Sequence, residues 1–161
     1  MSFSPAQCRA ARGLLGLSQL EVAKSAHITA PTLRAFERYG KEPSHNNLQA
    51  LRAALEAAGI VFVPASEGGA GVRLGTAPDG DVPGEAVFSQ ELCRAARGLL
   101  NLSQQDLADA AGIARSTVAE FERGARATVP SNLAAIRAAL EAAGAAFIDS
   151  NGGGPGVRLR E

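Results

Sequence analysis

The chain contains two copies of one sequence module, and this repeat limits the possible folds more than any other feature. When the sequence is shifted by 85 positions, residues 8–74 align with residues 93–159 without a gap, and 36 of the 67 aligned residues are identical. The runs CRAARGLL, RAALEAAG and GVRL occur in both copies. A repeat of this kind indicates one folding unit built twice. We predict modules at residues 1–75 and 89–161, with a linker at residues 76–88 that is rich in Gly, Pro and Asp.

The composition favours helices over strands. Hydrophobic residues make up 46% of the chain, with Ala and Leu dominant, while aromatic residues reach only 4%. No apolar run approaches the ~20 residues of a transmembrane helix. The N-terminus lacks the basic and then apolar pattern of a signal peptide. We therefore expect a cytoplasmic, mainly α-helical protein.

Charge is distributed unevenly along the chain although it sums to zero. When Lys and Arg are counted against Asp and Glu, residues 1–75 carry +3, residues 76–88 carry −3 and residues 89–161 carry 0. The first module is therefore mildly basic and the second is neutral. The zero total neither supports nor excludes binding to nucleic acid, because the local distribution of charge decides that interaction.

The spacing of apolar residues predicts four helices and a β-hairpin in each copy. In the first copy the helices cover about residues 5–15, 19–26, 30–38 and 47–58. The segments IVFVP and GVRL then read as a hairpin with a glycine-rich loop. Ser18 with Glu21 gives a capping-box pattern before the second helix, and Ser103 with Asp106 gives a weaker version of it.

The second and third predicted helices meet the packing demands of a helix-turn-helix pair. Where the two helices cross, the chain has a small residue, Ala23 or Ala108. The turn position, where φ is often positive, holds His27 in the first copy and Gly112 in the second. The remaining contact positions are apolar in both copies: Val22, Ile28, Leu33 and Phe36, and Leu107, Ile113, Val118 and Phe121. This pattern predicts a DNA-reading unit in each module.

Both modules resemble the Cro/cI-type helix-turn-helix family, also called the xenobiotic-response-element type. The resemblance rests on LLGLSQLEVAKSAHITAPTLRAFERYGKEP in the first copy and LLNLSQQDLADAAGIARSTVAEFERGARAT in the second. It covers residues 5–59 and 90–144 and implies a tandem repeat of a four- to five-helix domain. The hairpins and the linker lie outside the family's minimal domain. The ligand that the resemblance implies is double-stranded DNA, read by the third helix of each module.

The resemblance also assigns contacts to particular positions. Phosphate contacts fall at the start of the second helix and after the third, at Gln19, Arg38 and Lys41, and at Gln104, Arg123 and Arg126. Base contacts fall at the start of the third helix and one turn later, at Ala30, Pro31, Thr32 and Arg34, and at Arg115, Ser116, Thr117 and Glu120. The chemistry agrees, because helix N-termini attract phosphate and Arg can hold guanine with two hydrogen bonds.

We expect the other polar residues of the helices to stabilise the fold or to face solvent. The resemblance implies the ion pairs Arg12–Glu37 and Arg97–Glu122, which we expect to stabilise the fold rather than to bind DNA. The arginines at positions 9, 52, 94 and 137 lie on helical faces, and we expect them to be solvated. Cys8 and Cys93 occupy equivalent positions and should act as small core residues, not as a redox pair.

The sequence gives no sign of catalysis, of a cofactor or of a metal site. His27 and His45 have no partner at ligand spacing, and the second copy has Gly112 and Pro130 in their places. The glycine-rich segments SEGGAG and SNGGGPG lack the Lys-Ser/Thr pair that follows a phosphate-binding loop. No arrangement of nucleophile, base and acid occurs in both copies. We therefore expect a protein that is not an enzyme.

Two functions fit these observations. The first is a sequence-specific transcriptional regulator, most simply a repressor, with two recognition helices in adjacent major grooves. The second is a protein-interaction module on the same scaffold, such as an antitoxin or an antiactivator. Each hairpin has one apolar face and should therefore lie at an interface. That interface joins the two hairpins of one chain or, in a homodimer, those of two chains.

Overall fold

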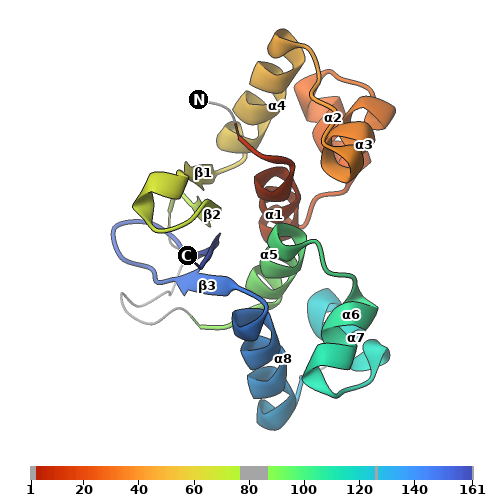
Figure 1. Cartoon of the computed structure of the whole chain (residues 1–161), viewed down its shortest axis with the longest axis vertical. Helices are drawn as coiled ribbons and strands as arrows, with labels where there is room; N and C mark the ends of the chain where they lie inside the picture. The colour runs from red at the N-terminus through yellow and green to blue at the C-terminus, as the bar shows by residue number, and fades with distance from the viewer. Residues whose placement is uncertain (1–2, 77–86, 126, 161) are drawn as a thin grey trace.

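The computed structural model describes residues 3–76, 87–125 and 127–160, which form two similar helical modules (Figure 1). The elements of the first module are α1 (Pro5–Leu15), α2 (Gln19–Ala26), α3 (Ala30–Tyr39), α4 (His45–Ala57), β1 (Ile60–Val63) and β2 (Gly71–Leu74). Those of the second are α5 (Gln90–Leu100), α6 (Gln104–Ala111), α7 (Arg115–Arg123), α8 (Pro130–Ala142), β3 (Ala145–Ile148) and β4 (Gly156–Leu159). The predicted fold class is confirmed. In the part of the chain described, no helix is long and apolar enough to cross a membrane.

Serine side chains determine where several helices begin. Ser18 closes the predicted capping box, and Ser103 closes the second one with Asp106 although Asp is shorter than Glu. The expected start of the fourth helix at residue 47 is two residues too late. The hydroxyl of Ser44 accepts a hydrogen bond from the backbone of Asn47, so the helix begins at His45.

The turn between α2 and α3 has the predicted left-handed backbone. His27 ends α2 with φ 55°, and Gly112 ends α6 with φ 68°. Both residues therefore reverse the chain in the same way, although His adopts this conformation less readily than Gly. The hairpin loop of the first module differs from its prediction, because it contains a turn of 3-10 helix at Ala65–Glu67.

An aromatic cluster joins each hairpin to its helices. The ring of Phe3 lies 5.8 Å from that of Phe36 and 4.9 Å from that of Phe62. Phe88 makes the equivalent contacts in the second module, at 5.8 and 5.4 Å. Phe88 was expected in the linker, but it packs with the core of the second module. Residues 77–86 of the predicted linker lie outside the described residues.

The two modules meet where α1 packs against α5. A Cβ atom on Gly13 would lie 2.6 Å from the carbonyl oxygen of Arg94, and one on Gly98 would lie 2.7 Å from that of Arg9. Only glycine permits so close an approach of the two backbones. Because the two contacts involve equivalent residues, the modules are related by an approximate twofold axis at this crossing.

The hairpins form one four-stranded antiparallel sheet in the order β1-β2-β4-β3. The central strands β2 and β4 pair at Val72↔Val157, with Gly71 opposite Arg158 and Arg73 opposite Gly156. These pairs are again equivalent residues of the two copies, so the axis that relates the helices also relates the strands. The predicted hairpin interface is therefore confirmed, and it forms within one chain.

Both helix-turn-helix units lie on the same side of the molecule. In Figure 1 the α1–α5 pair runs through the centre, with the sheet on the left. The α2–α3 and α6–α7 units lie on the right, one above the other. The close packing of α1 on α5 thus determines how the two units are placed relative to each other.

We expect Gly13→Ala to destabilise the protein, although Ala normally favours a helix. The new methyl group would meet the backbone of Arg94, and overpacking of this kind costs ~1–3 kcal/mol. The free energy of unfolding, from urea denaturation, measures the effect. The control is Ala53→Gly on the exposed face of α4. It measures what an exchange between Ala and Gly costs in a helix where no other backbone is close, ~1 kcal/mol. A Gly13→Ala protein as stable as the wild type would contradict the close contact.

Candidate nucleic-acid interface

Each module places two short helices at an angle around a tight turn. The backbone N–H of Ile28 donates to the carbonyl of Ala23 at 3.0 Å, and Ile113 donates to Ala108 at 3.0 Å. The residues predicted to pack between the helices are buried or half-buried: Val22, Ala23, Ile28, Leu33 and Phe36, and Leu107, Ala108, Ile113, Val118 and Phe121. The opposite faces of α3 and α7 are consequently left for solvent or a ligand.

The predicted contact residues of the first module lie along α3 and just beyond it. Pro31, Arg34 and Arg38 are exposed at spacings of three and four residues, so they share one face. Lys41 is also exposed. Ala30 and Thr32 are half-buried; Ala30 packs against the core, and the hydroxyl of Thr32 lies 2.7 Å from that of Thr29.

The second module presents a similar row. Arg115, Ser116 and Arg123 are exposed, whereas Thr117 and Glu120 are half-buried. The predicted contact residue Arg126 lies outside the described residues. The structure thus leaves part of the predicted set exposed to solvent, namely Pro31, Arg34, Arg38 and Lys41 in the first module and Arg115, Ser116 and Arg123 in the second. The contacts of the whole set with DNA stay predictions.

The Arg12–Glu37 pair joins α1 to α3, with the carboxylate buried in the core of the first module. Nε and Nη2 of Arg12 donate to the two carboxylate oxygens of Glu37 at 2.7 and 2.8 Å. Gln19 Nε2 donates to the same carboxylate at 2.8 Å, and the thiol of Cys8 approaches it at 3.3 Å. One N–H of Gln19, which was expected to face phosphate, is therefore used inside the protein. The glutamate is 4% exposed, so these donors replace the water that it has lost.

The second module repeats this cluster around Glu122. Nη2 of Arg97 donates to it at 2.7 Å, Gln104 donates at 3.1 Å, and the thiol of Cys93 lies at 3.4 Å. Burial by itself would raise the pKa of Glu122. The hydrogen bonds and the charge of Arg97 outweigh burial and hold that pKa below its ordinary value.

The two cysteines are structural donors. Both are fully buried, and burial together with the neighbouring carboxylate raises the pKa of Cys8 and of Cys93 well above the usual value for a thiol. A thiol with so high a pKa stays protonated and unreactive. The sequence placed both residues in the core but did not predict that each donates to a glutamate.

The expectation that Arg9 and Arg94 are solvated is wrong. Arg9 Nε donates to the carbonyl of Gly98 at 2.8 Å, and its Nη1 donates to the carbonyl of Glu37 at 2.6 Å. Arg94 makes the equivalent bonds at 3.0 and 2.7 Å. The acceptors lie in the last turns of their helices, where the carbonyls carry partial negative charge. Each arginine therefore ties the end of its own recognition helix to the other module.

Arg52 and Arg137 are also less solvated than expected. Each forms an ion pair with the glutamate four residues later on the same helix. Their guanidinium groups lie 5.2 and 5.5 Å from the ring centres of Phe62 and Phe147. They cover the aromatic clusters from the solvent side.

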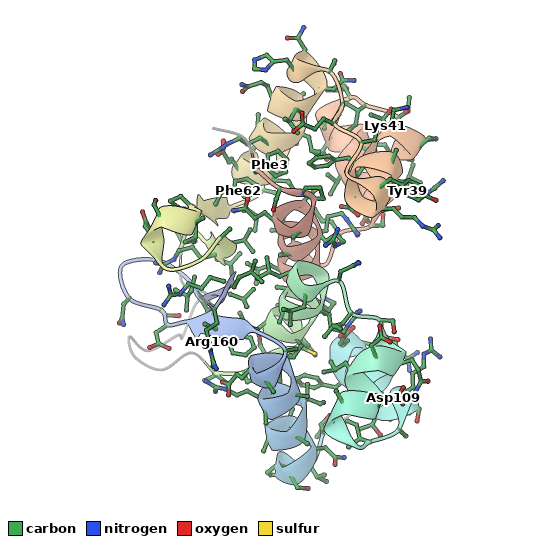
Figure 2. The ribbon with its side chains drawn as sticks, in the orientation of Figure 1. Phe3, Tyr39, Lys41, Phe62, Asp109 and Arg160 are labelled. Carbon is green, nitrogen blue, oxygen red and sulfur yellow. The ribbon has the colours of Figure 1, made fainter. Side chains whose placement is uncertain are left out.

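The two helix-turn-helix surfaces differ in charge. Residues 19–41 contain four cationic and two anionic side chains, while the equivalent residues 104–126 contain three and four. The largest change is at Lys24, whose equivalent is Asp109; both are exposed. Figure 2 shows Asp109 on the right of the second module, the side on which Lys41 lies in the first. The first helix-turn-helix unit therefore carries more positive charge than the second.

Sequence reasoning missed Tyr39 at the end of α3. Its side chain is 73% exposed, and the guanidinium of Arg38 lies 5.4 Å from the ring centre. Figure 2 shows it on the outer side of the first module, close to the end of the recognition helix. A phenol at this position can donate a hydrogen bond to a phosphate. The signal was a lone aromatic outside the apolar spacing of the helix.

A model of a known family matches both modules. The family described as "Helix-turn-helix" (HTH_3) matches residues 9–57 and 94–142, which together make up more than half of the chain. A search of curated proteins gives no match.

We expect Arg97→Ala to lower the free energy of unfolding by about 3 kcal/mol at pH 7, because Glu122 would stay buried without its partner. In the wild type the lowered pKa of Glu122 stabilises the fold above the ordinary value of 4.5, and this contribution is lost as the pH falls through the folded-state pKa. The variant can instead protonate the orphaned carboxyl. Its deficit should therefore shrink when urea denaturation is repeated at pH 4.

The control is Glu141→Gln, which removes the charge of a surface pair with Arg137 and leaves the contact of Arg137 with Phe147 in place. It should cost less than about 1 kcal/mol, with little change between the two pH values. Equal deficits for the two variants at pH 7 would show that the Arg97–Glu122 pair does not stabilise the fold.

Proposed function

The chain belongs to the Cro/cI-type helix-turn-helix family of DNA-binding regulators, and we propose that it is a transcriptional repressor that binds one DNA site with both modules. In this proposal α3 and α7 enter adjacent major grooves of one duplex, about 34 Å apart. Bound across a promoter, the protein would exclude the transcription machinery.

One observation carries this proposal. The two recognition helices lie on the same side of a joint built from the α1–α5 crossing and the continuous sheet. Regulators of this type place two recognition helices on successive turns of DNA by dimerising. Here the second helix comes from the same chain. The two halves can differ, so the DNA site need not be palindromic.

We assign different tasks to the two modules. The second recognition helix begins Arg115-Ser116-Thr117, which supplies one bidentate donor and two hydroxyls for base edges. The first begins Ala30-Pro31-Thr32, in which only the threonine side chain can form hydrogen bonds. The more cationic surface of the first module favours attraction to the backbone, which carries little sequence information.

The second candidate is a protein-interaction module, and the acidic surface of α6 favours it. Asp106 and Asp109 are both exposed there, and α6 contains no basic residue. Such a surface repels phosphate but suits a basic protein partner. Selection of bound sequences from a random duplex pool separates the candidates. Enrichment of one sequence supports the repressor, and failure to retain any duplex supports the protein-interaction module.

Duplex binding should depend strongly on salt. Four to six phosphate contacts give a slope of about −4 to −5 for the logarithm of the binding constant against the logarithm of the salt concentration. Fluorescence anisotropy on a labelled duplex between low and moderate salt measures this slope. An affinity that does not change over this range would contradict phosphate contacts by the proposed residues.

Arg115→Ala and Arg38→Ala should have different effects. Arg115→Ala should cost ~1–3 kcal/mol on the selected site and relax the preference at one or two base pairs. Arg38→Ala should weaken binding to all duplexes and reduce the salt slope by about one unit. Binding isotherms on the selected site and on scrambled DNA distinguish them. If Arg115→Ala loses affinity equally on both, Arg115 contacts phosphate and the division of tasks is wrong.

A further inference from the structure

A cavity of about 520 Å³ lies between the two modules at the α1–α5 crossing. Four arginines line it, Arg9 and Arg12 from the first module and Arg94 and Arg97 from the second. Among the described residues that line the cavity there is no Asp or Glu. Its wall is therefore cationic on both sides of the approximate twofold axis.

The four arginines fall into two classes. Arg12 and Arg97 are neutralised by the buried glutamates behind them. Arg9 and Arg94 donate only to backbone carbonyls, through Nε and Nη1. Their Nη2 groups form no hydrogen bond within the described part of the chain, so each keeps donors for a further acceptor. The pKa of Arg9 is lowered, chiefly by burial, as expected for a cation without a carboxylate of its own.

The cavity is on the side of the helix-turn-helix units. Its lining includes Gly16 and Ser18, which lead from α1 into α2, and the equivalent Asn101 leads from α5 toward α6. In Figure 1 these connections run to the right, between the two recognition units. A Cβ on Gly16 would lie 3.3 Å from Nη2 of Arg94, so that guanidinium reaches the connection of the other module.

We propose that this cavity binds a phosphate group, carried by a small molecule or by the DNA backbone. Guanidinium groups from two sides match the several oxygens of a phosphate, and charge-assisted hydrogen bonds of this kind are the strong ones. The volume is in the range of small-molecule sites. The ligand would contact the same two arginines that hold the ends of α3 and α7, so its binding would affect how the recognition helices are placed. Binding of a free phosphate does not depend on the proposed repressor function.

The first test uses the full-length wild-type chain and inorganic pyrophosphate at constant ionic strength. Nuclear magnetic resonance follows the backbone amides of Gly13, Gly16 and Gly98, all of which line the cavity. We expect saturable shifts at these three glycines, larger than those at Gly40 and Gly112, which lie away from it. Absence of saturable shifts at the cavity glycines, or shifts confined to the recognition helices, would overturn the proposal.

The second test compares two double variants. Arg9→Gln with Arg94→Gln should weaken pyrophosphate binding by about tenfold or more, because the donors with spare N–H groups are lost. Arg52→Gln with Arg137→Gln removes two equivalent arginines outside the cavity and should leave binding unchanged. Equal affinities for the two double variants would overturn the proposal. If the cavity variant fails to fold, the first test still decides whether the cavity binds pyrophosphate, because it uses the wild-type chain.

A third measurement separates the two sources of phosphate. If the DNA backbone fills the cavity, the selected duplex displaces pyrophosphate; if a small molecule fills it, both bind together. Either result supports the phosphate site once the glycine shifts are seen. Pyrophosphate binding by a protein that retains no duplex would contradict the repressor function alone.

Discussion

The packing of α1 against α5 is the contact on which the rest of the structure depends. It is possible because Gly13 and Gly98 remove the side chains that would separate the two backbones. The close approach brings the guanidinium groups of Arg9 and Arg94 within hydrogen-bond distance of carbonyls in the opposite module. The same guanidinium groups bind the last turns of α3 and α7. One glycine–arginine arrangement, used twice, therefore links the two recognition helices.

Inside each module the recognition helix is held by a buried carboxylate. Glu37 is a poor core residue on its own, because burial of an unpaired charge costs several kcal/mol. It is tolerated because Arg12, Gln19 and Cys8, which lie on other helices or at their starts, all donate to it. The carboxylate thus connects α1, α2 and α3, and it favours one relative placement of these helices.

Much of the fold was predictable because its signals are local. The box of Ser18 and Glu21 places the start of α2, and His27 in the turn has the backbone that the motif demands. Helix and hairpin positions followed from apolar spacing, whereas the ion pairs and the contact residues came from the family resemblance. The role of Arg9 was not predictable in this way, because its acceptor on Gly98 is 89 residues away.

A comparison of the two copies points to residues of the interface between the modules that the spacing of apolar residues does not reveal. Arg9 and Gly13 are unchanged at positions 94 and 98, although many exposed residues of the modules differ. The same shift of 85 relates Phe3 to Phe88 and would have placed Phe88 in a core instead of a linker. The sequence did not distinguish pairing of β2 with β4 in one chain from pairing between two chains, because either hairpin could have paired with one from another chain.

The continuity of the sheet within one chain has a consequence for dosage. In a regulator that must first dimerise, the concentration of the dimer falls with the square of the monomer concentration when the protein is scarce. Here the partner module belongs to the same chain, so pairing is intramolecular and its effective concentration does not depend on the number of chains present. The paired arrangement therefore forms at any cellular abundance of the chain. Occupancy of a DNA site would rise in simple proportion to the number of molecules, down to a few copies per cell.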